Sequence, residues 1–149
     1  MDTDPLPFRI FNEIGIISQL SSAILSRVLP HGLSMAQFGV LNHFVRLGGE
    51  RTPANLAEAF QVTRGAMTNT LARLEAQGFI QVRPDPEDGR GKLVTITDAG
   101  RTAREDALKI LMAEVGKVEG KIDWRDLAEI LPRLETLRKV LDEERFKGN

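Results

Sequence analysis

The sequence predicts a mainly α-helical protein with one small β-hairpin, and three observations support this fold class. Apolar residues recur at steps of three or four through most of the chain, as they do on one face of an amphipathic helix. Capping residues and glycines divide these stretches into separate helices. Only over residues 79–97 does the pattern change to β-branched and apolar residues on both sides of a polar link, which is typical of a hairpin.

Two helices are expected before residue 50. The first runs from Phe8 to Leu29 and ends at the Pro-His-Gly sequence of residues 30–32. Ser34 is placed to cap the second helix, which Gly48 stops. The apolar stripe of the first helix is Phe11, Ile14, Ile17, Leu20, Ile24 and Val28. The second helix is expected to turn Phe38, Leu41, Phe44, Val45 and Leu47 toward a core.

A pair of short helices follows. Thr52 and Pro53 are a start signal, because the threonine oxygen can cap free amides and proline suits the first helical position. After a tight connection at residues 61–62, Thr63 is placed to cap a helix that runs to about Gln77. The residues expected to face the core are Leu56, Ala57 and Phe60, then Met67, Leu71 and Leu74. Two short helices joined by so few residues make a helix-turn-helix.

A hairpin and two further helices complete the pattern. Strands are expected at residues 79–83 and 92–97, with turn formers and charges between them. Thr97 or Asp98 opens a long helix, and Asp123 caps a last one that Pro132 should kink by removing a backbone donor. The apolar side of the long helix is Ala103, Ala107, Leu108, Leu111, Met112, Val115, Val118 and Ile122. That of the last helix is Trp124, Leu127, Ile130, Leu131, Leu134, Leu137 and Leu141.

Composition excludes several mechanisms. The chain has no cysteine, which rules out disulfides, thiolate zinc sites and thiol redox switches. His31 and His43 are expected to be structural or solvated, and no carboxylate cluster or phosphate-binding glycine loop completes a catalytic or cofactor site. We therefore expect no enzyme activity and no cofactor. Without an apolar run of about eighteen residues or a basic leader, the chain is expected to be cytoplasmic and to have no membrane partner.

The net charge of −1 conceals an uneven distribution. Residues 51–104 carry 8 basic and 6 acidic side chains, whereas the segments before and after them carry more acidic than basic ones. The excess is small, but DNA affinity depends on where the cations lie. No acidic residue occurs between Glu58 and Glu75, over the second helix of the pair.

That helix has two predicted faces. Met67, Leu71 and Leu74 are spaced to pack on the core, and the residues that point away are Arg64, Gly65, Thr68, Asn69 and Ala72. Small and hydrogen-bonding side chains can enter a DNA major groove, where carboxylates would meet phosphate repulsion. Asn69 is suited to an adenine edge, and Thr68 to a phosphate or a thymine methyl group. The alternative is that Thr68, Asn69 and Thr70 are ordinary solvated helix surface.

The hairpin tip is the second candidate element. Arg90 and Lys92 can reach phosphates or a minor groove, provided that the carboxylates at positions 85, 87 and 88 are turned elsewhere. A contact between Asp88 and Arg90 would stiffen the turn and aim the guanidinium. The alternative is a solvated hairpin with scattered charges.

A helix, a helix-turn-helix and a charged hairpin in this order together make a winged helix-turn-helix. Two segments of the sequence resemble the MarR family of bacterial transcription regulators. These are VTRGAMTNTLARLEAQGFI at residues 62–80 and RPDPEDGRGKLVTITDAGR at residues 83–101. The resemblance implies Thr63, Arg64, Gly65, Thr68 and Asn69 at the DNA and Arg90 at the wing. It also implies that Asp88 orients Arg90 and that Arg73 supports the recognition helix from behind. Proteins of this family often bind small aromatic or phenolic anions in a crevice beside the DNA-binding lobe.

The apolar stripes outside the helix-turn-helix exceed what a small core can cover, which indicates a homodimer. We expect an N-terminal dimerisation helix at residues 1–33, a winged helix-turn-helix at 34–98 and C-terminal dimerisation helices at 99–149. A self-contained monomeric bundle is the alternative for the stripes. The predicted function is a regulator, expected to be a repressor, that binds a roughly palindromic duplex and is released by an aromatic effector. A winged-helix module used only for protein contacts is the competing hypothesis.

Overall fold

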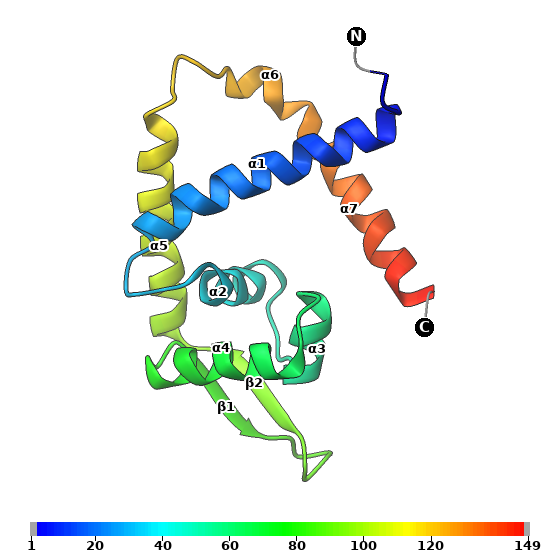
Figure 1. The fold of residues 1–149 in the computed structure, drawn as a ribbon. Helices are drawn as coiled ribbons and strands as arrows, with labels where there is room; N and C mark the ends of the chain where they lie inside the picture. The colour runs from blue at the N-terminus through cyan, green and yellow to red at the C-terminus, as the bar shows by residue number, and fades with distance from the viewer. Residues whose placement is uncertain (1–2, 148–149) are drawn as a thin grey trace. The chain divides into compact units, whose positions relative to one another are not determined.

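The computed structural model describes residues 3–147; residues 1–2 and 148–149, at the outer ends of the two predicted dimerisation segments, lie outside the described residues. The chain forms two compact units, one through Met112 and one from Ala113, and each is described by itself. Figure 1 labels the helices and strands. In chain order they are α1 (Leu6–Val28), α2 (Met35–Leu47), α3 (Pro53–Ala59), α4 (Arg64–Ala76), β1 (Ile80–Pro84), β2 (Lys92–Ile96), α5 (Asp98–Gly116), α6 (Trp124–Ala128) and α7 (Ile130–Lys147).

Side-chain caps start the three helices that follow α1, as the sequence predicts. Ser34 Oγ accepts a hydrogen bond from the Gln37 amide at 3.1 Å, and Gln37 Oε1 accepts one from the Ser34 amide at 2.8 Å. Thr52 and Thr63 each accept a hydrogen bond at 3.1 Å from the backbone amide three residues further on. These bonds satisfy amides that the first helical turn leaves free. The starts of α2, α3 and α4 are therefore encoded locally.

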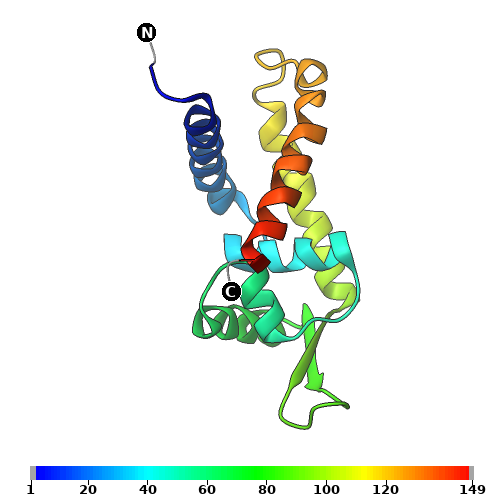
Figure 2. The same cartoon turned by 90° about the vertical axis from the view of Figure 1, so that its right-hand side faces the viewer.

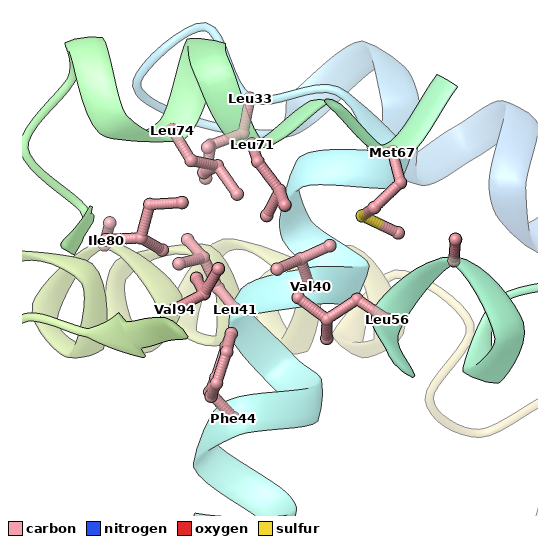
Figure 3. Close-up of a cluster of buried hydrophobic side chains, with 12 residues drawn as sticks. Leu33, Val40, Leu41, Phe44, Leu56, Met67, Leu71, Leu74, Ile80 and Val94 are labelled. Carbon is pink, nitrogen blue, oxygen red and sulfur yellow. The ribbon is translucent and has the colours of Figure 1, made fainter. Parts of the chain in front are cut away.

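The buried core of the first unit joins α2, α3, α4, the hairpin and α5. In Figure 3 the side chains of α4, among them Leu71 and Leu74, point toward α2. The largest fully buried side chains are Phe44, Leu41, Leu56, Leu74, Val40 and Val94. The prediction that Leu47 faces the core is wrong, because this leucine is 50% exposed. Leu47 is the last residue of α2, one turn beyond Phe44, so it lies past the end of the core.

The hairpin is antiparallel and projects from the helical body. Ile80 lies opposite Ile96, and Pro84 lies opposite Lys92. Arg51, in the connection between α2 and α3, pairs with β2 as a short third segment of the sheet. Its amide donates to the Val94 carbonyl at 3.1 Å, and its carbonyl accepts from the Val94 amide at 2.8 Å. Figures 1 and 2 both show the hairpin tip reaching away from α2, α3 and α4 of the same unit. The middle of β2 is thus anchored by Arg51, while the tip at residues 85–91 extends beyond this pairing.

The long helix α5 ends earlier than predicted. It stops at Gly116, so Val118 and Ile122 do not belong to its apolar side. Lys117, Val118 and Glu119 instead make tight turns, each donating to the carbonyl three residues before it. Glycine is a poor helix former, and Gly120 with φ 87° continues the chain in the left-handed region. Apolar spacing alone did not reveal this end.

The last helix is two segments and not one kinked helix. Asp123 caps α6 by accepting a hydrogen bond from the Arg125 amide at 2.9 Å, as predicted for its capping role. α6 ends at Ala128, and α7 starts at Ile130 with Pro132 in its first turn. Proline has no amide hydrogen to donate to the carbonyl of Ala128, and the first turn is where a helix tolerates it. The interruption therefore falls on the N-terminal side of the proline.

Among residues 3–147, no helix is both long enough and apolar enough to cross a membrane. The boundary between the two compact units falls inside α5, after Met112. The predicted segments 1–33, 34–98 and 99–149 divide the chain by role and not by compactness, and that division stays a prediction.

Candidate nucleic-acid interface

α4 presents one exposed face of small and hydrogen-bonding side chains. Met67, Leu71 and Leu74 are 3%, 5% and 0% exposed, which confirms the predicted inner face. The exposed residues of the helix include Arg64, Gly65, Thr68, Asn69, Ala72 and Arg73. Thr70 is half-buried, and its hydroxyl donates to the Ala66 carbonyl at 3.1 Å, so it serves the helix itself. The exposed face is thus shaped by Gly65, Thr68, Asn69 and Ala72.

The N-terminal end of α4 is polarised for an anion. The first turn contains no acidic residue. Thr63 satisfies the Ala66 amide, and Arg64 adds an exposed cation. Within the part of the chain that is described, the guanidinium of Arg64 forms no ion pair. Because helix N-termini carry partial positive charge, both features favour a phosphate or another anion here.

The packing of the protein does not require a glycine at position 65. A Cβ built on it would meet nothing within 4 Å of the rest of the chain, and its backbone is helical. Glycine inside a helix costs about 1 kcal/mol relative to alanine. A glycine that the fold does not need, on an exposed helix face, lets another molecule approach the backbone closely.

The wing tip is held by its own aspartates. Asp85 Oδ1 accepts a hydrogen bond from the Glu87 amide at 2.9 Å, and Asp88 Oδ1 accepts one from the Arg90 amide at 3.1 Å. Asp88 therefore contacts the backbone of Arg90 and not its guanidinium. The carboxylates of Asp85 and Asp88 therefore form hydrogen bonds within the turn, whereas the side chain of Glu87 is exposed to solvent. The backbone at Arg90 is fixed, and its side chain is left pointing to solvent.

The cations of the wing are available to a partner. Arg90 and Lys92 are exposed, and neither forms an ion pair with any residue from 3 to 147. Arg73 on α4 is likewise exposed, and no described carboxylate pairs with it. Its expected supporting function behind the recognition helix stays a prediction. The hairpin and α4 belong to the same compact unit, so these cations share one body with the exposed face.

The tip-side end of β1 carries an ion pair that sequence reasoning missed. Arg83 on β1 donates through its Nη2 to Glu50, in the connection between α2 and α3. Both side chains are about two-fifths exposed, at 41% and 43%. With the backbone pairing of Arg51 to Val94, the ion pair links the wing to the α2–α3 connection. No spacing rule joins residues so far apart in the chain, so the pairing emerges only from the fold.

The two histidines fit the expectation that they are structural or solvated, since His43 is partly buried and His31 is exposed. His43 is partly buried beside Phe60, with ring centroids 5.4 Å apart. Burial, together with the nearby charges of Arg46 and Arg51, lowers the pKa of His43, which favours the neutral form of its ring. His31 Nε2 lies 2.8 Å from Asp106 Oδ2. In the described part of the chain, no three ligand side chains gather in a way that could hold a metal ion.

A second feature missed from the sequence is the amide side chain of Gln37, which is 4% exposed. It donates to Gln77 Oε1 at 3.2 Å, and Gln77 in turn donates to the carbonyl of His31 at 2.9 Å. The Ser-x-x-Gln spacing of a capping box was a usable signal for Gln37, because a glutamine there reaches back to the cap. Nothing local points to Gln77.

The geometry defines a winged helix-turn-helix protein, and comparisons with known proteins identify its family. The MarR family profile matches residues 31–91. The multiple antibiotic resistance protein MarR of Escherichia coli is 32% identical over 110 residues, which cover 68% of this chain and 76% of that protein. The transcriptional activatory protein BadR of Rhodopseudomonas palustris is 32% identical over 118 residues, covering 77% of this chain and 66% of that protein.

Solved structures of transcription regulators are also similar to this chain. The transcriptional regulator BldR from Sulfolobus solfataricus has a TM-score of 0.76 and 26% identity, covering 96% of this chain and 99% of that one. A mutant MarR from E. coli complexed with operator DNA has a TM-score of 0.68 and 25% identity, covering 92% and 99%. The chain belongs to the MarR family. It is a DNA-binding transcription regulator and not an enzyme.

Proposed function

We propose that the protein acts as a homodimer that binds a roughly palindromic duplex site in the cytoplasm and represses the genes beside it. In each protomer, α4 enters the major groove, and the wing contacts the phosphates or the minor groove of the flanking DNA. The observation that carries this proposal is the exposed side of α4, where Gly65, Thr68 and Asn69 lie. Arg64, at the start of the same helix, has no ion-pair partner among residues 3–147. Small donors and acceptors next to a cation fit base edges flanked by phosphates.

The wing supports the same proposal. Phosphate contacts position a protein on DNA, and they need cations that are not already neutralised. Arg90 and Lys92 meet this condition, because neither forms an ion pair with any residue from 3 to 147. Thr63 is proposed to lie at the DNA through its position at the start of α4, where free amides also favour a phosphate.

Dimerisation is supported by apolar side chains that α1 leaves uncovered. No residue of α1 is buried. Its large exposed apolar residues are Leu6, Phe8, Ile10, Phe11, Ile14, Ile16, Ile17, Leu20 and Ile24. In the second unit, α6 and α7 expose Trp124, Leu127, Ile130, Leu131, Leu134, Val140, Leu141 and Phe146. Surfaces of this kind mark protein–protein interfaces. A two-fold dimer would place two recognition helices about one DNA turn, or 34 Å, apart.

Repression is the proposed outcome of binding, since a dimer seated on a promoter blocks access to it. The relative BadR is named an activatory protein, so the direction needs its own test. A reporter gene behind the protein's own upstream region should rise in expression when the protein is deleted. A fall on deletion would indicate an activator.

We also propose a small aromatic anion as effector, by analogy with the family. A ligand that binds the folded dimer must stabilise it by mass action, by about 2.7 kcal/mol at one hundred times its Kd. Thermal-shift screening of phenolic and benzoic acids should therefore find a compound that raises Tm and weakens operator binding. A library that moves neither quantity would remove this part of the proposal.

Two substitutions separate phosphate contact from base readout. Arg90→Ala should weaken binding to many sequences alike and reduce the salt dependence by about one unit of slope, because one phosphate contact is lost. Asn69→Ala should instead change the preference at about one or two base pairs. Gel shifts at several salt concentrations, with duplexes selected from a random pool, measure both. If both variants bind like the wild type, the site assignment fails.

The competing function is a winged-helix module for protein contacts alone. It has no need of unpaired cations on α4 and on the wing. The deciding measurement is a gel shift on the protein's own upstream region. If no duplex from that region binds in a salt-sensitive way, the interaction module becomes the better hypothesis.

A further inference from the structure

A chain of hydrogen bonds connects the end of the recognition helix to the turn that follows α1. Gln77 is the C-terminal cap residue of α4. Its Nε2 donates to the carbonyl of His31 at 2.9 Å, and its Oε1 accepts from Gln37 Nε2 at 3.2 Å. Both polar atoms of the Gln77 amide are therefore used inside the protein, at the opposite end of α4 from Arg64.

Gln37 holds this amide in place. Its side chain is buried, and its Oε1 is already occupied by the Ser34 amide at 2.8 Å. A buried amide that lost either bond would leave a polar group unsatisfied, which costs more than the bond itself contributes. The side-chain amide of Gln37 can therefore satisfy both of its polar atoms in only one orientation. In that orientation its Nε2 donates a hydrogen bond to Oε1 of Gln77.

The turn at the other end of the chain of bonds is equally constrained. His31 and Gly32 both have left-handed backbones, with φ 60° and 66°, and the Leu33 amide closes the turn on the Pro30 carbonyl at 3.1 Å. A left-handed backbone is uncommon for residues other than glycine. Leu33 is 4% exposed, which anchors the turn in the core. The direction in which α1 leaves the body depends on this turn.

From this geometry we propose that Gln77, held by Gln37, is a positioning residue that sets which half-site spacing the protein accepts. It fixes the end of α4 to the turn from which α1 departs. The inference depends on the proposed function, in which α1 contributes to the dimer contact. Through α1 and this turn, the dimer contact determines where each recognition helix lies relative to its partner copy. Gln77 itself needs no contact with DNA.

The test is the discrimination between operator spacings. The probes are a palindromic duplex selected by the wild-type protein, the same duplex with one base pair added or removed between the half-sites, and a single half-site. One base pair rotates a half-site by about 34° around the helix axis, so a rigidly spaced dimer must discriminate. Gln77→Leu should reduce the ratio between the Kd values for altered and original spacing by about fivefold, the factor expected for the Gln77–His31 hydrogen bond, which is the one of its two bonds that ties α4 to the turn. Its Kd for the half-site should stay that of the wild type.

Two control variants separate positioning from general loosening. Asn42→Leu removes a comparable tie, because Asn42 Oδ1 on α2 accepts from Arg104 Nε and Nη2 on α5 at 3.2 and 3.1 Å, in bonds that do not include the turn. His31→Gly keeps the carbonyl that Gln77 bonds and suits the left-handed backbone, while it removes the ring from Asp106. Both should discriminate spacings as the wild type does. Melting temperatures check that all three variants fold.

The outcomes are distinguishable. A wild type that binds no duplex would overturn the proposed function and this inference with it. A wild type that binds with a spacing preference that Gln77→Leu retains would overturn the inference alone. Equal loss of discrimination in Asn42→Leu would also overturn it, since any weakening of the core would then have the same effect.

Discussion

Gly100→Ala should lower the free energy of unfolding by about 3 kcal/mol or more, at the upper end of what overpacking costs in a well-packed core. Gly100 is buried in the first turn of α5. A Cβ added there would overlap the carbonyl oxygen of Phe79 and lie 2.9 Å from Cγ1 of Ile96. The Phe79 backbone has little freedom to yield, because its amide bonds to Leu74 and its carbonyl accepts from Thr97, at 3.0 and 3.1 Å. Denaturant unfolding followed by circular dichroism measures the change.

The matched control is Gly116→Ala in the same helix. A Cβ at Gly116 meets nothing within 4 Å of the rest of the chain. Alanine is the better helix former by up to about 1 kcal/mol, so this variant should be as stable as the wild type or more so. If Gly100→Ala were as stable as its control, the close approach of α5 to Phe79 would be wrong.

The second large effect is expected from Ile17→Glu. Ile17 is 61% exposed in the middle of α1, on the apolar stripe proposed to form the dimer contact. In a two-fold dimer, the substitution would bury one glutamate carboxylate from each copy in the contact without a partner, which costs several kcal/mol. The protein should therefore dissociate to single chains. Each chain would then bind only one half-site, and affinity for the palindrome should fall by about one hundredfold or more, because the second contact is no longer intramolecular.

Light scattering measures the mass of the protein in solution, and gel shifts on the selected duplex measure its affinity for the palindrome. Gln19→Glu is the control, because two residues along a helix turn the side chain by about 200°, to the side of α1 away from the stripe. It adds the same charge and should leave mass and affinity unchanged. A dimeric Ile17→Glu with wild-type affinity would mean that the stripe on α1 does not hold the copies together.

Most of the helix-turn-helix could be predicted from the sequence because its signals are local. Ser34, Thr52 and Thr63 each cap a helix through an amide three residues away, and Gly78 follows α4 with φ 75°. Such bonds form within one turn, so short spacings reveal them. The inner face of α4 followed from the helical period alone, since its residues pack on a core that lies on one side.

The features that were missed depend on contacts between distant segments. Glu50 pairs with Arg83 and Gln37 with Gln77 across intervals that carry no periodic signal. Leu47 fitted the apolar spacing of α2, but burial depends on what covers a residue, and the core ends one turn earlier. The DNA contacts expected of Arg64 and Arg90 depend on a partner that is not part of the chain.

The bonds within the wing tip also bear on how quickly and tightly the wing engages its target. Since Asp85 and Asp88 already hold the loop in one shape, little conformational entropy of its main chain remains to be lost on association. For the proposed contact with DNA, the ordering cost would fall mostly on the exposed side chain of Arg90, at about 0.5–1.5 kcal/mol for one long side chain. A prearranged loop of this kind favours rapid capture over slow refolding around the duplex.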